Sequence, residues 1–110
     1  MGGSTADIAT KKLFENQEFV VWEMVLEPGQ SNGTHTHSRG FYLCVVEGGS
    51  VEVTDAQGNS LGRYDVSSGF TRFMRFDGDA LVADAVRLPL THDTRNVGSA
   101  RYREILIEIK

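Results

Sequence analysis

The sequence predicts an all-β protein that folds as a single domain. Its 110 residues suit one domain with one hydrophobic core. The chain has twelve glycines but only two prolines, and short segments rich in β-branched and aromatic residues alternate with polar turns. No segment keeps a 3.6-residue hydrophobic period over ten residues or more. About eight short strand-like segments, at turn intervals of about 8 to 12 residues, indicate a sandwich or a barrel.

Two segments predict strands most clearly. Residues 19–26, FVVWEMVL, alternate so that one face is wholly apolar and the other is mixed. Residues 41–46, FYLCVV, are apolar on both faces, which suits a strand between two layers or at a subunit contact. Further strands are expected at residues 50–54, 61–66, 70–76 and 80–88. The last expected strand, residues 104–110, separates two faces: Ile105, Ile107 and Ile109 against Glu104, Leu106 and Glu108.

Composition limits the partners and the location of the chain. We expect residues 1–17 to form a partly flexible N-terminal arm and residues 18–110 to form the folded domain. A formal net charge of −4 argues against nucleic acid, because no basic face is available to replace counterions. No apolar run approaches the roughly 20 residues that span a bilayer. The single cysteine and a start without the apolar centre of a secretory signal favour the cytoplasm.

The segment 28–37, PGQSNGTHTH, contains the pattern that points to chemistry. His35 and His37 are one residue apart, so on an extended strand both project to the same face. Imidazole is the commonest protein ligand for first-row transition metals. A third ligand has to come from elsewhere, and His92 is the only other histidine of the chain. The pattern by itself allows two interpretations, a metal site or two solvated polar residues.

The surroundings of these histidines resemble the first motif of the cupin superfamily, G-x5-H-x-H-x3,4-E-x6-G. Gly29, His35, His37 and Gly49 fall in register with it, and Tyr42 stands where the glutamate is expected. The usual set of three histidines and one glutamate is therefore incomplete. Glu47, the nearest acid downstream, is five positions beyond and should face the other side of the strand.

The end of the chain resembles the second cupin motif, a proline region followed by H-x3-N. The segment PLTHDTRNVG resembles this motif at Pro89, His92 and Asn96. The proline is displaced, because Arg87 occupies the position where the motif usually has it. The resemblance covers roughly residues 18–110. Within the superfamily the chain is most similar to short bacterial cupins associated with beta-alanine degradation, through VWEMVLEPG, EVTDAQGN and HDTRN…EILIEIK.

This resemblance implies a fold, a cofactor and partners. The expected fold is the cupin jelly-roll barrel, also called a double-stranded β-helix. The expected cofactor is one divalent transition metal held by His35, His37 and His92, and nitrogen ligands suit Fe, Zn, Ni, Mn and Cu alike. The expected partners are a small polar molecule inside the barrel and a second copy of the chain in a homodimer.

The resemblance leaves the activity open between two main hypotheses. The chain is either a mononuclear three-histidine dioxygenase-like enzyme or a cupin that binds a small molecule without turnover. A sugar isomerase or epimerase is a third hypothesis, which the lack of a clear acid–base pair disfavours.

Several side chains could contribute to such a site. Tyr42 is the tentative catalytic residue: it could bind the metal, hydrogen-bond to a bound water or oxygen species, or only fill space. Cys44 shares its face and is expected to be a small apolar residue. Three arginines could bind a substrate carboxylate or lie at the rim of the sheet: Arg72, Arg75 and Arg87.

Overall fold

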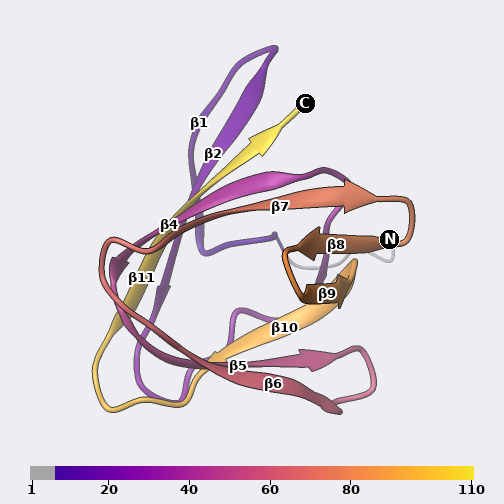
Figure 1. Ribbon diagram of the computed structural model, residues 1–110. Helices are drawn as coiled ribbons and strands as arrows, with labels where there is room; N and C mark the ends of the chain where they lie inside the picture. Colours follow the sequence, from indigo (N-terminus) through magenta and orange to yellow (C-terminus); the bar gives the residue numbers. More distant parts are fainter. Residues whose placement is uncertain (1–6) are drawn as a thin grey trace.

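The computed structural model describes residues 7–110, which form eleven strands in two facing antiparallel sheets (Figure 1). The larger sheet has the order β1 (Lys11–Glu15), β2 (Phe19–Leu26), β11 (Tyr102–Ile109), β4 (Phe41–Glu47), β7 (Thr71–Asp77), β8 (Ala80–Ala83) and β9 (Val86–Pro89). The smaller sheet has the order β3 (His35–Thr36), β10 (Thr91–Asn96), β5 (Gly49–Asp55) and β6 (Ser60–Val66). The prediction of an all-β fold is confirmed. No helix among residues 7–110 is long and apolar enough to cross a membrane.

Strands β2 and β11 form the centre of the larger sheet. They pair along their full lengths, from Tyr102 opposite Leu26 to Ile109 opposite Phe19. The apolar face predicted for β2 is buried, and this register places the even-numbered residues of β11 on the same inner side. The sequence left open which face of the last strand points inwards. The structure buries the face with the glutamates and leaves the isoleucines on the outer side.

The two inward glutamates of β11 are accommodated by hydrogen bonds. Glu108 accepts one from the indole Nε1 of Trp22 at 2.8 Å. Glu104 accepts one from the Tyr102 hydroxyl at 3.0 Å. An amide or hydroxyl group buried without a partner costs roughly 2–7 kcal/mol by transfer scales, and an ionised carboxylate costs more. The inner face therefore combines apolar packing with polar groups that have partners.

The structure contains strands that the sequence patterns did not reveal. The segment 80–88 is a hairpin of two strands, because Asp84 adopts a left-handed conformation (φ 48°) and reverses the chain. Such a conformation is open to Asp more readily than to most residues. Strand β10, THDTRN, is polar at every position and therefore lacks an apolar alternation. Strand β1 pairs with β2 inside the predicted arm, while residues 1–6 of that arm lie outside the described residues.

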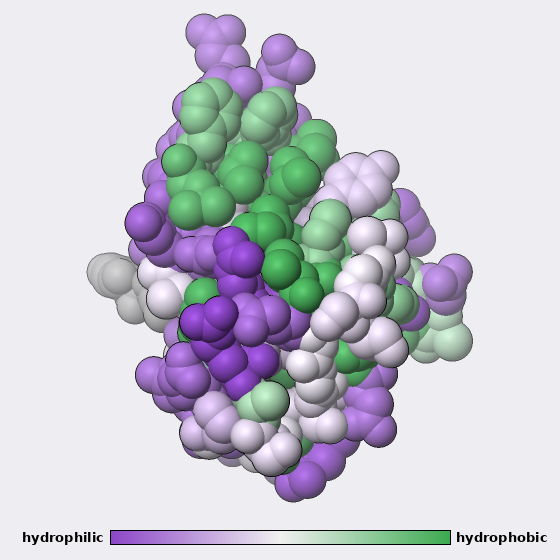
Figure 2. Space-filling model, turned by 90° about the vertical axis from the view of Figure 1, so that its left-hand side faces the viewer, coloured by the Kyte–Doolittle hydropathy of each residue, from purple (hydrophilic) through white to green (hydrophobic). Residues whose placement is uncertain are grey.

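The outer face of the larger sheet carries a row of apolar side chains. In the strand registers, Phe14 lies opposite Val21, Val21 opposite Ile107, Ile107 opposite Tyr42, and Tyr42 opposite Phe73. Phe14, Tyr42 and Phe73 are 52%, 49% and 40% exposed. Figure 2 shows that apolar side chains gather on one side of the molecule. A row that crosses five strands is a suitable contact surface for a second copy of the chain.

The homodimer stays a prediction, and this row gives it a test. Because Lys would place a charge in the centre of an apolar contact, Phe73→Lys is expected to convert a dimer into a monomer in sedimentation velocity at micromolar concentration. Gln57→Lys adds the same charge on the exposed β5–β6 turn and should leave the dimer intact. A monomeric wild-type chain would contradict the prediction.

Candidate metal centre

His35 and His37 lie at the inner side of the smaller sheet, as their two-residue spacing predicts. Both are 2% exposed, whereas Thr36 between them is exposed. The loop before them is fixed by Gly33, whose positive φ of 95° favours glycine. The N–H of Gly33 donates to Oδ1 of Asp93 at 2.9 Å, which ties this loop to β10.

His92 joins the pair through the β3–β10 ladder. In this ladder His92 lies directly opposite His35, and the hydroxyls of Thr36 and Thr91 meet on the exposed side at 2.8 Å. The ring centroid of His92 is 4.7 Å from that of His35 and 5.0 Å from that of His37. One nitrogen from each ring lies within 4.8 Å of the others. The three histidines named from the sequence therefore form one buried cluster.

The hydrogen bonds of the imidazoles favour metal ligation. Nδ1 of His35 donates to the carbonyl of Gly33 at 2.7 Å, and Nδ1 of His92 donates to the carbonyl of Pro89 at 2.8 Å. A neutral imidazole that donates from Nδ1 has an unprotonated Nε2, which is the ligand form. Nδ1 of His37 is buried and has no hydrogen-bond partner among residues 7–110, and the His37 ring stacks on Phe41 with the ring centroids 4.6 Å apart. This donor set fits a metal ion.

Electrostatics keep the cluster neutral. Burial, together with repulsion from His92 and His35, lowers the pKa of His37 to about 2. Burial lowers the pKa of His92 to about 4 and also lowers that of His35, although the carbonyls of Pro89 and Gly33 oppose these shifts. All three rings are therefore neutral at neutral pH, and each offers the lone pair of one ring nitrogen to a cation.

Tyr42 does not reach the cluster, and its tentative catalytic assignment needs correction. It lies on the outer face of β4 with its ring centroid 4.6 Å from that of Phe73. The first motif allows three or four residues after its second histidine, and a spacing of three puts Phe41 and Gly48 in register. Phe41 is the inward residue, and a Cβ at Gly48 would collide with the backbone of the segment after β6. The position of the missing glutamate is thus filled by a phenylalanine.

The other polar residues that the sequence analysis considered make contacts away from the histidine cluster. Asn96 is fully buried and donates to the carbonyls of Leu26 and Ala100, so it holds β10 against the end of β2. Arg87 forms ion pairs with Asp77 and Asp79, and Arg75 pairs with Asp77 at 3.7 Å. Glu47 binds Arg101 at 2.7 Å. None of these side chains is part of the cluster.

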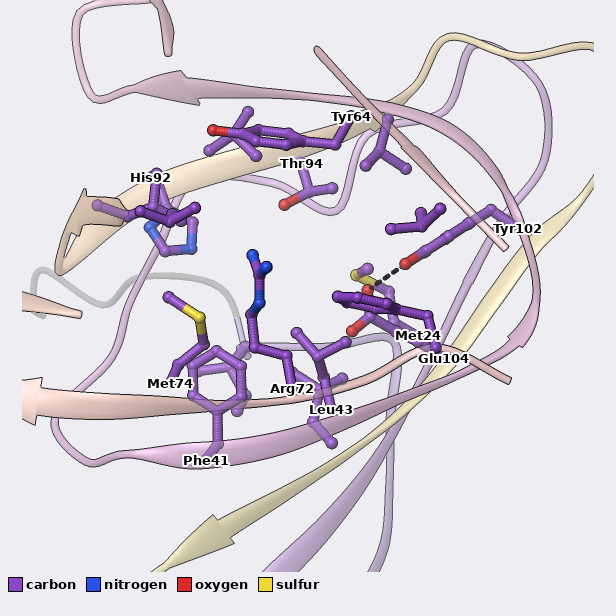
Figure 3. A pocket seen from close by; sticks show the side chains of 18 of the residues that line it. Met24, Phe41, Leu43, Tyr64, Arg72, Met74, His92, Thr94, Tyr102 and Glu104 are labelled. Atoms are coloured by element: carbon purple, nitrogen blue, oxygen red, sulfur yellow. Dashed lines mark hydrogen bonds between the residues drawn. The ribbon is translucent and has the colours of Figure 1, made fainter. Parts of the chain in front are cut away.

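The histidine cluster borders a cavity of about 500 Å³ between the sheets (Figure 3). Most of its walls are apolar, from residues such as Met24, Leu43, Val51, Met74 and Leu106. Three polar side chains that the sequence analysis did not bring together also line it: Arg72, Tyr102 and Glu104. Tyr102 and Glu104 are two residues apart on one strand, so the sequence could have placed them on the same face. The alternation of side chains along residues 70–76 could likewise have placed Arg72 on the inward face.

Glu104 is the unusual member of this cavity. Burial raises its pKa to about 7, and the hydrogen bond from Tyr102 opposes the shift. At neutral pH the carboxyl group is therefore protonated in part of the molecules. Burial, with the charge of Glu104, also raises the pKa of Tyr102, so this hydroxyl stays protonated and donates a hydrogen bond to Glu104.

Comparisons with solved structures identify the fold. No family model and no curated protein sequence matches the chain. A cupin domain from Bordetella pertussis Tohama I superimposes with a TM-score of 0.70 and 19% identity, over 91% of this chain and 90% of that one. An RmlC-like cupin family protein from Methanocaldococcus jannaschii, with a double-stranded β-helix fold, gives a TM-score of 0.59 and 13% identity over 96% and 86%. A cupin-superfamily sugar phosphate isomerase from Silicibacter pomeroyi gives 0.55 and 20% over 86% and 52%. The predicted cupin double-stranded β-helix fold is confirmed.

The raised pKa of Glu104 predicts how stability depends on pH. The ordinary pKa is 4.5 and the folded value is about 7, so the folded protein binds more protons between these values and loses stability as the pH rises through them. Glu104→Gln removes this loss. Its free energy of unfolding, relative to wild type, should increase by about 2 kcal/mol between pH 5 and pH 8. The histidines titrate in both proteins and cancel in the difference. Urea unfolding of both proteins at several pH values measures this difference, and a difference independent of pH would contradict the assignment.

Proposed function

We propose that this cupin-fold chain binds one divalent transition metal through His35, His37 and His92 and acts on a small polar metabolite as a mononuclear three-histidine dioxygenase. One observation carries the proposal: three neutral, buried imidazoles converge next to a cavity, and no carboxylate from residues 7–110 joins them. Fe, Zn, Ni, Mn and Cu all suit this donor set.

The residues around the cluster suit a reaction on a small molecule. A metal with three protein ligands supplies open coordination positions, as in catalytic rather than structural sites. The apolar walls exclude water from a ligand in the cavity, and Phe41 keeps the plane of His37 fixed by stacking. Glu104 can hold or release a proton near neutral pH, and Tyr102 positions its carboxyl group.

The same Glu104 supports a second candidate, a proton-transfer reaction of the isomerase type. The sequence offered no acid–base pair for such a reaction, whereas the structure places a carboxyl group with a raised pKa in the cavity. One of the similar structures is a sugar phosphate isomerase. A binding protein without turnover would use the same cluster and cavity, so activity has to be measured directly.

Metal content tests the common premise of these hypotheses. Wild-type protein purified without chelators is expected to carry about one transition-metal ion per chain, because three preset imidazoles bind such ions tightly. His35→Ala and His92→Ala should each lose most of this metal in elemental analysis. Tyr42→Phe is the matched control and should retain it, because Tyr42 faces the outside of the sheet. Metal-free wild type that also fails to take up added Fe(II), Zn(II) or Ni(II) would refute the site.

Two measurements on one substrate panel separate the possible activities. Wild type is loaded with Fe(II) in the absence of oxygen and mixed with small carboxylic acids, thiols or sugar phosphates. Oxygen is then admitted and its uptake is measured. A dioxygenase consumes oxygen with one of these compounds, and His92→Ala abolishes this uptake. An isomerase instead exchanges a substrate proton with D2O without oxygen uptake, and Glu104→Gln should slow the exchange by about 10²-fold or more. Saturable binding with neither reaction would favour the binding protein.

A further inference from the structure

Arg72 is the one cavity residue with a permanent charge and no acidic partner among the described residues. Of the two arginines that line the cavity, Arg63 pairs with Glu52 at 3.5 Å. Arg72 forms no ion pair or side-chain hydrogen bond within residues 7–110, and it is only partly exposed. A guanidinium group has five donors and remains charged at all physiological pH values, so it requires an acceptor.

The strand register directs Arg72 inwards. It lies opposite Leu43 in the β4–β7 ladder, and both residues line the cavity. Its guanidinium carbon is 5.2 Å from the centre of the Phe70 ring, a cation–π contact that limits its movement. Figure 3 shows the guanidinium pointing into the cavity, with His92 on one side and Glu104 on the other in this view.

The acids of the cavity are occupied by other groups. Glu104 binds the Tyr102 hydroxyl, and the raised pKa of its carboxyl group leaves it partly uncharged near neutral pH. Asp65 accepts a hydrogen bond from the Ser50 hydroxyl. Arg72 is therefore the cation of the cavity whose charge is not compensated by an ion pair within residues 7–110, and an anionic group of an incoming ligand would be attracted to it.

We propose that Arg72 binds the carboxylate of the small molecule that enters this cavity, so that the ligand is a monocarboxylate with an apolar body. A planar guanidinium matches a carboxylate with two parallel hydrogen bonds. One unpaired guanidinium, with no helix N-terminus among residues 7–110 to add backbone donors, suits one negative charge better than a phosphate group. The apolar walls then contact the remainder of the ligand. The inference deepens the proposed function, because it names the class of molecule that this site takes.

Benzoate and benzamide are suitable probes, since they have the same ring and differ in charge. Each is titrated into ¹⁵N-labelled, metal-free wild type, and amide shifts along β4 and β7 are followed. Benzoate should bind saturably and about 10-fold or more tightly than benzamide, the gain typical of a charge-assisted pair. Inorganic phosphate should bind more weakly than benzoate.

Two variants on the same strand isolate the guanidinium group. Arg72→Gln should weaken benzoate binding about 10-fold or more and leave benzamide binding unchanged. Arg75→Gln is the matched control, because Arg75 lies on β7, is 60% exposed and pairs with Asp77. It should bind both probes as wild type does. Circular dichroism and thermal unfolding show whether each variant is folded, and Arg72→Lys serves as a second variant if Arg72→Gln does not fold.

The possible results distinguish this inference from the proposed function. Equal binding of benzoate and benzamide, tighter binding of phosphate, or unchanged benzoate binding in folded Arg72→Gln would each overturn the carboxylate assignment. Absence of saturable benzoate binding to both metal-free and Zn(II)-loaded wild type would overturn it as well. Selective benzoate binding in a protein that takes up no metal would support the role of Arg72 and refute the metal site.

Discussion

The pairing of β3 with β10 is the interaction on which the candidate site depends. This ladder contains only two residue pairs, Thr36 with Thr91 and His35 with His92. Because side chains alternate along a strand, a shift by one residue would place a threonine inside and a histidine outside. The contact between the two threonine hydroxyls and the bond from Gly33 to Asp93 hold the register on either side. So short a ladder is sufficient because β10 is fixed by five further pairs with β5.

The interior of the barrel joins apolar packing to polar groups that are individually satisfied. Trp22 binds Glu108 and Tyr102 binds Glu104. The side chain of Asn96 binds backbone groups at the end of β2 and in the loop between β10 and β11. Among residues 7–110 the exceptions lie at the cavity, where Nδ1 of His37 is buried without a hydrogen-bond partner and the partly exposed Arg72 has no ion pair. An unsatisfied buried polar atom is rare in folded proteins and requires an explanation. The position of both groups at one cavity is what an incoming ion and ligand would explain.

The sequence was sufficient to predict the fold class and to name the three histidines that cluster. It was insufficient wherever one had to decide which of two adjacent strand residues faces inwards. His35 and His37 are on one face for any extended backbone, so their convergence followed from spacing alone. Tyr42 and Phe41 differ by one position, and only the observed register shows that Phe41 faces inwards. The same ambiguity applied to the last strand, where the sequence did not decide which face points inwards. The isoleucine face is the more apolar one, yet the face with the glutamates is buried. The sequence pattern did not predict strand β10, because its side chains are polar and the strand is held by backbone pairing with β3 on one side and β5 on the other.

The two sheets divide the site between them. The three histidines come from the smaller sheet, on β3, directly after it, and on β10. Arg72 and Glu104 come from β7 and β11 of the larger sheet. Substitutions at the inward positions of the larger sheet can therefore change the shape and polarity of one cavity wall without altering the imidazole geometry opposite. A scaffold arranged in this way can vary that wall one position at a time while the histidine cluster is kept.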